Sequence, residues 1–161
     1  MLERIHTVLG FDYGLKRIGV ATGQRITATA APLNALAARD GVPDWAHVET
    51  VIKEWQPHAL LVGLPLNMDD SESEISRLAR KFARRLEGRF ALPVFMVDER
   101  LTSRSARELL VDISERRKGK LPSLDSTAAV LMVEGWLSQP TLEWKPLRRD
   151  SHALKKLFTD I

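Results

Sequence analysis

The chain has 161 residues, enough for one α/β domain with a real core and too few for two full domains. Hydrophobic residues make up 44% and charged residues 28%, which excludes a disordered composition. No apolar run reaches about 18 residues, so we expect no membrane span and no membrane partner. The absence of cysteine excludes disulfides and thiolate metal sites, and the N-terminus lacks the layout of a secretory signal. We therefore expect a cytoplasmic protein.

Lysine and arginine number 24 against 21 acidic residues, which gives a net charge of +3 and a pI near 9.4. This total is a weak indication of a polyanionic partner, and the distribution is more informative. The basic residues fall into three clusters: Arg77, Arg80, Lys81, Arg84 and Arg85; Arg116, Arg117, Lys118 and Lys120; Arg148, Arg149, Lys155 and Lys156. Each cluster alone is also compatible with an ordinary solvated face.

The first part of the chain predicts three strands joined by short turns. Residues 7–11 form a buried apolar run that ends at Asp12, and Gly14 permits a tight turn. Residues 17–22 predict a returning strand, and a third strand is expected within residues 27–36, with edges made uncertain by Pro32. Three strands before any helix predict an antiparallel meander.

Strands then alternate with helices. A helix is expected from the N-cap Asp44 to about Trp55, followed by a buried strand at 59–63. The next helix is opened by a capping box at 71–74 and ended by Gly88, and a strand follows at 93–97. We then expect a helix from Thr102 or Ser105 to about Ile113, a basic loop at 114–122, and a helix from Leu124 to about Leu137. Strands that alternate with helices after a meander predict a mixed five-stranded α/β sheet flanked by helices. We place one domain at 1–139 and a basic C-terminal tail at 140–161, which is either flexible or docked.

No nucleophile is apparent. There is no cysteine and no Gly-x-Ser-x-Gly elbow, the four histidines have no ligand-like spacing, and a phosphate-cradling P-loop is absent. Carboxylates at the ends of buried segments remain as candidates for chemistry.

Three positions carry such carboxylates. Asp12 follows the first buried strand, although a turn aspartate that binds its own backbone gives the same pattern. Asp98 and Glu99 follow another buried strand, and because successive side chains point to opposite faces, only one of them can easily face Asp12. Asp125 lies in the first turn of the last predicted helix, where a carboxylate is also favoured by the helix dipole alone.

Converging carboxylates repel one another unless cations offset their charge. Two Mg²⁺ or Mn²⁺ ions about 3.5–4 Å apart can activate water and stabilise the leaving oxygen of a phosphodiester. Oxygen ligands without histidine or cysteine favour Mg²⁺ or Mn²⁺ over Zn²⁺. The sequence alone does not establish that these carboxylates converge.

Four segments resemble the motifs of the bacterial YqgF/RuvX family of ribonuclease-H-like proteins, and they occur in the family's order. They are FDYGLKRIGVA at 11–21, VGLPLNMD at 62–69, DERLTS at 98–103 and LDSTAA at 124–129. Together they cover roughly residues 8–137. One departure is Asp70, which occupies a position where the family usually has glycine.

The resemblance implies a ribonuclease-H-like sheet in which Asp12, Glu99 and Asp125 are catalytic, metal-binding carboxylates. It also implies that Lys16, Arg17, Asn67 and Arg100 contact the substrate, three of them through its phosphates. The family is associated with maturation of the 5′ end of 16S rRNA and was earlier described as a Holliday-junction resolvase.

The leading hypothesis is therefore a metal-dependent nuclease acting on precursor 16S rRNA, with ribosomal particles as further partners. One alternative is a resolvase of branched DNA, and another is a non-catalytic nucleic-acid-binding module in ribosome biogenesis or transcription. An actin-like ATPase is excluded because 161 residues cannot supply its two domains. The sequence leaves open a monomer or a homodimer, and whether Asp98 joins Glu99 as a ligand.

Overall fold

The structure is a computed structural model that describes residues 2–65, 73–99, 125–147 and 154–155. Its elements in chain order are η1 (Leu2–Arg4), β1 (Thr7–Asp12), β2 (Arg17–Gln24), β3 (Thr29–Arg39), β4 (Val42–Pro43), α1 (Trp45–Trp55), β5 (Ala59–Leu64), α2 (Glu74–Phe90), β6 (Val94–Asp98), α4 (Asp125–Ser138), η3 (Thr141–Glu143) and β7 (Lys145–Pro146). The helix expected near 102–113 and the basic loop at 114–122 lie outside the described residues. No helix in the described ranges is long and apolar enough to cross a bilayer.

A single mixed sheet forms the centre of the molecule, with strand order β4-β3-β2-β1-β5-β6-β7. Strands β1 to β4 pair antiparallel, as the meander predicted, and β5 and β6 continue parallel to β1. The predicted fold class is confirmed, but within the described residues the sheet already has seven strands and not five. The extra strands, β4 and β7, are two residues long, so they carry no periodicity and are defined only by their pairing with β3 and β6.

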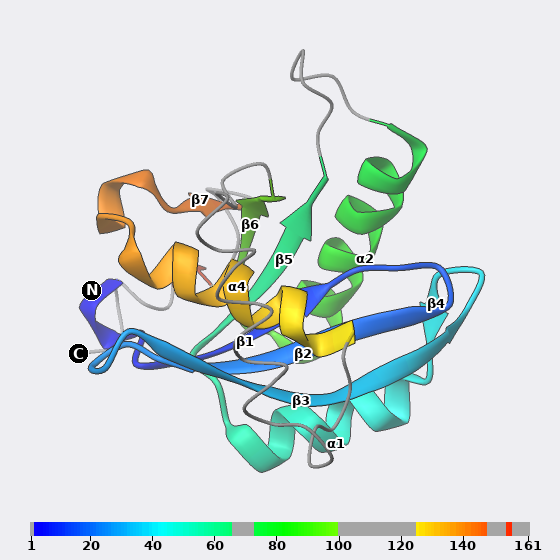
Figure 1. Cartoon of the computed structure of the whole chain (residues 1–161), viewed down its shortest axis with the longest axis horizontal. Helices are drawn as coiled ribbons and strands as arrows, with labels where there is room; N and C mark the ends of the chain where they lie inside the picture. The colour runs from blue at the N-terminus through cyan, green and yellow to red at the C-terminus, as the bar shows by residue number, and fades with distance from the viewer. Residues whose placement is uncertain (1, 66–72, 100–124, 148–153, 156–161) are drawn as a thin grey trace.

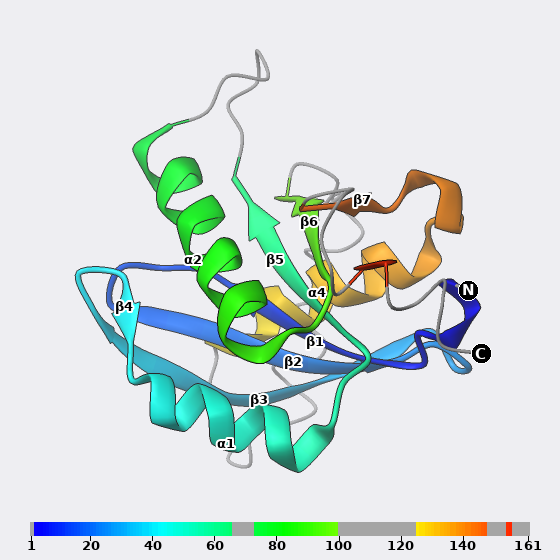
Figure 2. The same ribbon diagram turned by 180° about the vertical axis from the view of Figure 1, so that it is seen from behind.

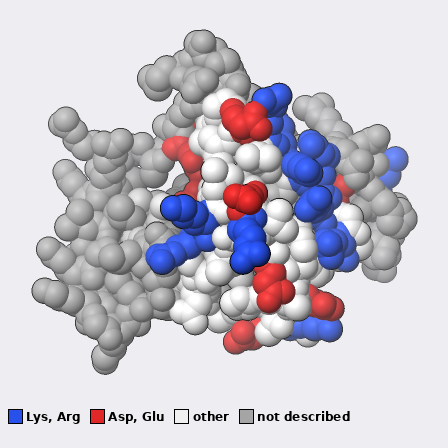
Figure 3. Space-filling view, turned by 90° about the vertical axis from the view of Figure 1, so that its right-hand side faces the viewer, with Lys and Arg blue, Asp and Glu red and all other residues white. Residues whose placement is uncertain are grey.

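Helices cover both faces of the sheet. Figures 1 and 2 show α1 and α2 on one face and α4 on the other. On the side of the molecule drawn in Figure 3, Lys and Arg side chains gather in a column. Helix α2 contains six basic residues. Side chains of β1 alternate between the faces, so Leu9 and Phe11 face α1 and α2 while Val8 faces α4.

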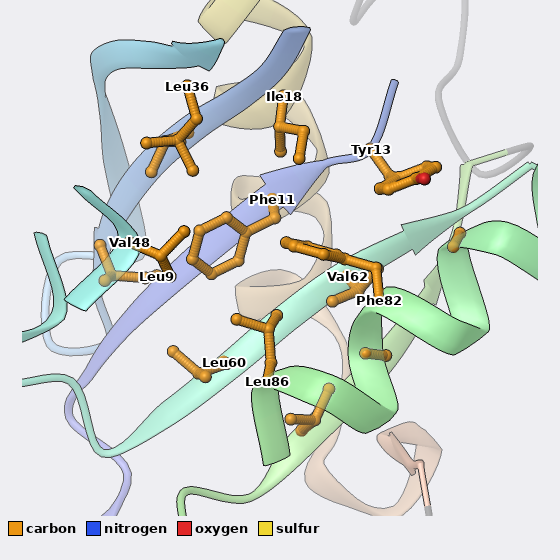
Figure 4. Packing of buried hydrophobic residues seen from close by; sticks show 14 of the residues in the cluster. Leu9, Phe11, Tyr13, Ile18, Leu36, Val48, Leu60, Val62, Phe82 and Leu86 are labelled. Carbon is orange, nitrogen blue, oxygen red and sulfur yellow. The ribbon is translucent and has the colours of Figure 1, made fainter. Parts of the chain in front are cut away.

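Aromatic and aliphatic side chains fill the core under α1 and α2 (Figure 4). Phe11 of β1 meets Phe82 of α2 edge-on, with ring centroids 5.7 Å apart, and Leu60 and Leu86 close the layer beside them. Burial of each such side chain contributes about 1.5–3 kcal/mol. This face therefore fixes α2 against β1 and β5.

The α4 face packs more closely because β1 and β2 lack side chains where the helix crosses them. A Cβ added to Gly10 or to Gly23 would overlap a methyl group of Val133. At the start of the helix, the Ser126 Oγ accepts a hydrogen bond from the backbone N–H of Val20 at 3.1 Å, beside a bulge in β2. The first turn of α4 is thereby fixed next to the end of β1.

Helix α2 does not have the predicted boundaries. Its N-cap is Ser73, whose side chain forms a capping box with Ser76, so the helix begins later than the predicted capping box at 71–74. The helix also continues through Gly88 to Phe90, and Ala91 is the C-cap with a φ of 53°. The Gly88 prediction was wrong because that glycine lies on the exposed side of the helix and Pro93 follows the actual end.

Part of the predicted tail packs on the domain. Trp144 stacks on Trp136 of α4 with ring centroids 3.8 Å apart, and its Nε1 donates to the Trp136 carbonyl at 3.1 Å. The guanidinium group of Arg25 lies over the Trp144 ring, 5.0 Å from its centroid. Residues 141–147 therefore extend the sheet through β7, beyond the predicted domain boundary at 139.

The close approach of α4 yields a test with a matched control. We expect Gly10→Ala to lower the free energy of unfolding by about 1–3 kcal/mol, because the added methyl group overpacks the contact with Val133. Gly135→Ala, on the exposed side of α4 where a Cβ meets nothing, should raise it by about 0.5–1 kcal/mol. Urea unfolding measures both, and a neutral Gly10→Ala would contradict this packing.

Candidate functional site

Asp12 is the last residue of β1 and is half-buried at the carboxyl end of the strand. Its neighbours on alternate positions, Val8 and Gly10, face α4, so the Asp12 side chain lies on that same face. In the antiparallel pair with β2 it stands opposite Gly19, one residue from the backbone group that Ser126 binds. Asp12 therefore lies close to the start of α4.

Glu99 comes directly after β6 and reaches Asp12. Phe95 and Val97 of β6 belong to the core under α4, whereas Met96 belongs to the core under α2. Because side chains alternate between the two faces of the sheet, Glu99 lies on the same face as Asp12 and Asp98 lies on the opposite face. In agreement, the Glu99 carboxyl group forms a hydrogen bond with Asp12, across the intervening strand β5.

Gly63 of β5 makes room for this contact. A Cβ at position 63 would overlap Oε1 of Glu99 and would approach the Met132 sulfur to 2.8 Å. The Glu99 carboxyl group thus occupies the space that a side chain on the middle strand would fill. Gly63 was not predicted as a site residue, although a glycine within the apolar run of a buried strand is a signal of close approach.

The pair has an unusual charge state. Burial raises the pKa of Glu99 to about 8, and the hydrogen bond to Asp12 and the charges of Asp12 and Asp98 act in the same direction. At neutral pH the Glu99 carboxyl group therefore holds a proton that it shares with Asp12. A bound cation would favour the ionised form that this environment opposes.

Asp125 is the first residue of α4, so its backbone lies at the same sheet edge as Asp12 and Glu99. Its side chain lies outside what the structure describes. Among the described side chains, the site contains the Asp12–Glu99 pair and no group of three acidic or histidine residues able to hold a metal. The role of Asp125 as a third ligand remains a prediction.

The predicted substrate-binding residues fall into two groups. Lys16 is exposed in the turn that joins β1 to β2, and Arg17 is the exposed first residue of β2, at the same edge as Asp12. The turn is fixed to the β3–β4 hairpin, since the Lys16 carbonyl accepts from the N–H of Ala38 at 2.8 Å. Asn67 and Arg100 lie outside the described residues, as does Asp70.

Comparison with known proteins supports one family. The RuvX family model, described as Holliday junction resolvase, matches residues 6–139. A protein of Pseudomonas aeruginosa strain PAO1 is 53% identical over 135 residues, which cover 84% of this chain and 94% of the relative. A protein of Saccharophagus degradans is 50% identical over 133 residues, covering 83% and 94%. Both relatives are named "Putative pre-16S rRNA nuclease".

Solved structures agree on the fold. RuvC of Thermus thermophilus in complex with a Holliday junction substrate has a TM-score of 0.60 at 14% identity, covering 88% of this chain and 99% of RuvC. Another structure of Thermus thermophilus RuvC has a TM-score of 0.56 at 14% identity, covering 87% of this chain and 99% of RuvC. The predicted ribonuclease-H-like fold and the predicted family are thus confirmed. The chain belongs to the RuvX family.

Proposed function

We propose that this protein is a metal-dependent nuclease that hydrolyses phosphodiester bonds during 5′-end maturation of precursor 16S rRNA. The observation that carries the proposal is the contact between Asp12 and Glu99 at the carboxyl edge of the sheet. Its support is the family match over residues 6–139 and the naming of relatives that are 50–53% identical. We place its action in the cytoplasm, on free or particle-bound precursor RNA, as a monomer or a homodimer.

The donor set fits a hard divalent cation. Asp12 and Glu99 offer carboxylate oxygens in direct contact, and α4 begins with a third carboxylate residue, Asp125. Burial raises the pKa of Glu99, and the nearby carboxyl groups of Asp12 and Asp98 raise it further, so a divalent cation at this position would stabilise the ionised form. Mg²⁺ or Mn²⁺ prefers such oxygen ligands, and we expect two ions held by Asp12, Glu99 and Asp125.

Each residue then has a distinct task. Asp12 and Glu99 hold the cations, which when bound supply activation of water and charge stabilisation at phosphorus. Lys16 and Arg17 present positive charge beside this edge, where they bind the phosphates that flank the scissile bond. The close packing of α4 keeps the carboxylates in position, so that little rearrangement is needed when substrate binds.

RNA is favoured over branched DNA as the substrate. The relatives named for precursor 16S rRNA share half of the residues over more than four fifths of this chain, whereas RuvC, at 14% identity, shares the fold. The family description keeps Holliday junction resolution as the second candidate. A non-catalytic binder is disfavoured, because clustered carboxylates oppose the binding of a polyanion.

Replacement of one carboxylate tests the site. Asp12→Asn should lower Mg²⁺- or Mn²⁺-dependent cleavage of precursor 16S rRNA by at least about a hundredfold, because a ligand worth several kcal/mol in the transition state is lost. Folding should be retained, since asparagine has the size of aspartate and its side-chain oxygen can still accept a hydrogen bond from the protonated Glu99 carboxyl group. A labelled precursor RNA and a four-way DNA junction, assayed side by side, measure the loss and the substrate preference.

Asp44→Asn is the matched control for this experiment. Asp44 caps α1 through a hydrogen bond from the Ala46 N–H, and asparagine caps equally well, so cleavage should stay at the wild-type level. Equal cleavage by Asp12→Asn and wild type would show that the catalytic centre lies elsewhere.

The proton on Glu99 gives a test that needs no cleavage. Its pKa is raised from 4.5 to about 8 in the folded, metal-free protein, so the folded state binds more protons than the unfolded state between these values. The free energy of unfolding should therefore fall as pH rises through this window. Asp12→Asn should reduce this slope, as measured by urea unfolding in EDTA at several pH values.

Metal should remove the same proton. Titration of the protein with Mn²⁺ at pH 7, in buffers of different ionisation enthalpy, should show proton release on binding. If no proton is released and the slope with pH is the same in Asp12→Asn, the carboxylate pair does not hold the cation.

A further inference from the structure

The outer side of α2 is strongly basic. The helix contains six basic residues against Glu74 and Glu87, and of these two acids Glu87 is buried while Glu74 forms an ion pair with Arg77. We name as the α2 basic face the side chains of Arg77, Arg80, Lys81, Arg84, Arg85 and Arg89. Except for the half-buried Arg80, all of them are exposed, on the side opposite the buried stripe that packs on the sheet (Figure 3).

A small pocket adjoins this face. Lys81 and Arg85 line it together with Tyr13, Gly41 and Trp45, and its volume is about 80 Å³. That volume is well below the roughly 300–1,000 Å³ of a cofactor or small-molecule site, so it suits a single charged group on a larger ligand. Two cations, Lys81 and Arg85, stand against one carboxylate in the lining, Asp40, so the pocket favours a negatively charged group.

The pocket is connected to the catalytic edge through Tyr13. Tyr13 follows Asp12 directly and faces the other way, packing on Phe82 of α2 with ring centroids 5.3 Å apart (Figure 4). Its hydroxyl donates to the Gly41 carbonyl at 2.9 Å. Consecutive residues thus border the carboxylate pair on one face of the sheet and the basic pocket on the other.

The intervening turn is held in place and is also basic. The N–H of Gly41 donates to the Leu15 carbonyl, and the N–H of Ala38 to the Lys16 carbonyl, both at 2.8 Å. Lys16 and Arg17 therefore stand at a fixed position between the Asp12 site and the pocket. The turn therefore adds two basic residues between the catalytic edge and α2, and Asp40 is the acidic residue of the pocket beside them.

We propose that the α2 basic face and its pocket bind the sugar–phosphate backbone of the nucleic acid substrate outside the catalytic site. The substrate then passes around the carboxyl edge of the sheet, with the scissile phosphate on one face and a flanking segment on the other. This inference rests on the proposed nuclease function, because it assigns the surface to the same substrate.

Geometry and charge favour a nucleic acid backbone as the occupant. The helix has 17 residues and a length of about 25 Å, and it presents about one cation per turn, a spacing suited to a row of phosphates. A second copy of this chain bound through the same face would place like charges opposite each other. Binding at this face should depend on the charge of the backbone and not on the nucleotide sequence, since phosphates carry no sequence information.

Binding measured without catalysis tests the surface. In an Asp12→Asn background with EDTA, we expect Arg84→Gln/Arg85→Gln to weaken binding of a fluorescein-labelled hairpin from the precursor 16S rRNA leader by about tenfold at low salt. The slope of log Kd against log salt concentration should fall by about 1.5–2, as two phosphate contacts are lost. Fluorescence anisotropy over a salt series measures both quantities.

The matched control removes the same charge elsewhere. Lys53→Gln/Lys145→Gln changes two exposed lysines on α1 and β7, away from the α2 basic face, and should leave the salt slope at its wild-type value. Arg84→Lys/Arg85→Lys should restore most of the affinity, because phosphates are bound here as charges. Circular dichroism and urea unfolding verify that all variants are folded.

The outcomes separate this inference from the proposed function. Equal losses in the two double-glutamine variants, or no loss in either, would overturn the role of α2 even if the wild type cleaves RNA. Selective loss in Arg84→Gln/Arg85→Gln would support it, and would still do so if the wild type cleaved nothing, in which case the nuclease proposal alone would fail.

Discussion

The close packing of α4 on the sheet is the constraint on which the site depends. The helix approaches β1, β2 and β5 at positions where each strand has a glycine: Gly10, Gly23 and Gly63. At the first two, Val133 occupies the space of the missing side chain, and at Gly63 the Glu99 carboxyl group and Met132 do. The same packing that stabilises the fold therefore leaves an opening for an acidic group in the middle of the sheet edge.

Placing the Glu99 carboxyl group in this opening is electrostatically unfavourable. The Glu99 carboxyl group is largely removed from water and lies against Asp12, so its ionised form is unfavourable and its pKa rises to about 8. The fold compensates with apolar packing on both faces of the sheet, where Phe11 meets Phe82 and Trp136 stacks on Trp144. A site whose buried acidic pair is electrostatically unfavourable is thus held by a core that does not depend on it.

Much of this arrangement could be predicted from local patterns. The five longer strands, α1 with its Asp44 cap and the helix near 125–138 all have clear periodicity or caps, and the structure confirms them. Strands β4 and β7 and the ends of α2 could not be predicted, because pairing with β3 and β6 and the Ser73–Ser76 capping interaction decide them. The spacing of residues along the chain does not show which distant strand or side chain such a segment will contact.

The site shows the same limit at the level of single residues. The alternation of side chains along a strand predicted that only one of Asp98 and Glu99 could easily face Asp12. The core positions of Phe95 and Val97 show that this residue is Glu99. Gly63 went unrecognised, since its role depends on which residue of a neighbouring strand lies above it. The roles of Asn67, Arg100 and the Asp125 side chain stay predictions, because these groups lie outside the described part of the chain.

Because successive side chains of a strand point to opposite faces of the sheet, one short segment can contribute residues to two surfaces. Asp12 and Tyr13 are neighbours in the chain, yet one faces the carboxylate pair under α4 and the other packs against α2. A ligand that follows the sheet edge meets negative charge on the first face and positive charge on the second. A cation bound at Asp12 and Glu99 would reverse the sign of the charge on the first face only, and the whole edge would then attract a polyanion. Substrate affinity and metal affinity would therefore be coupled through Asp12 and Glu99.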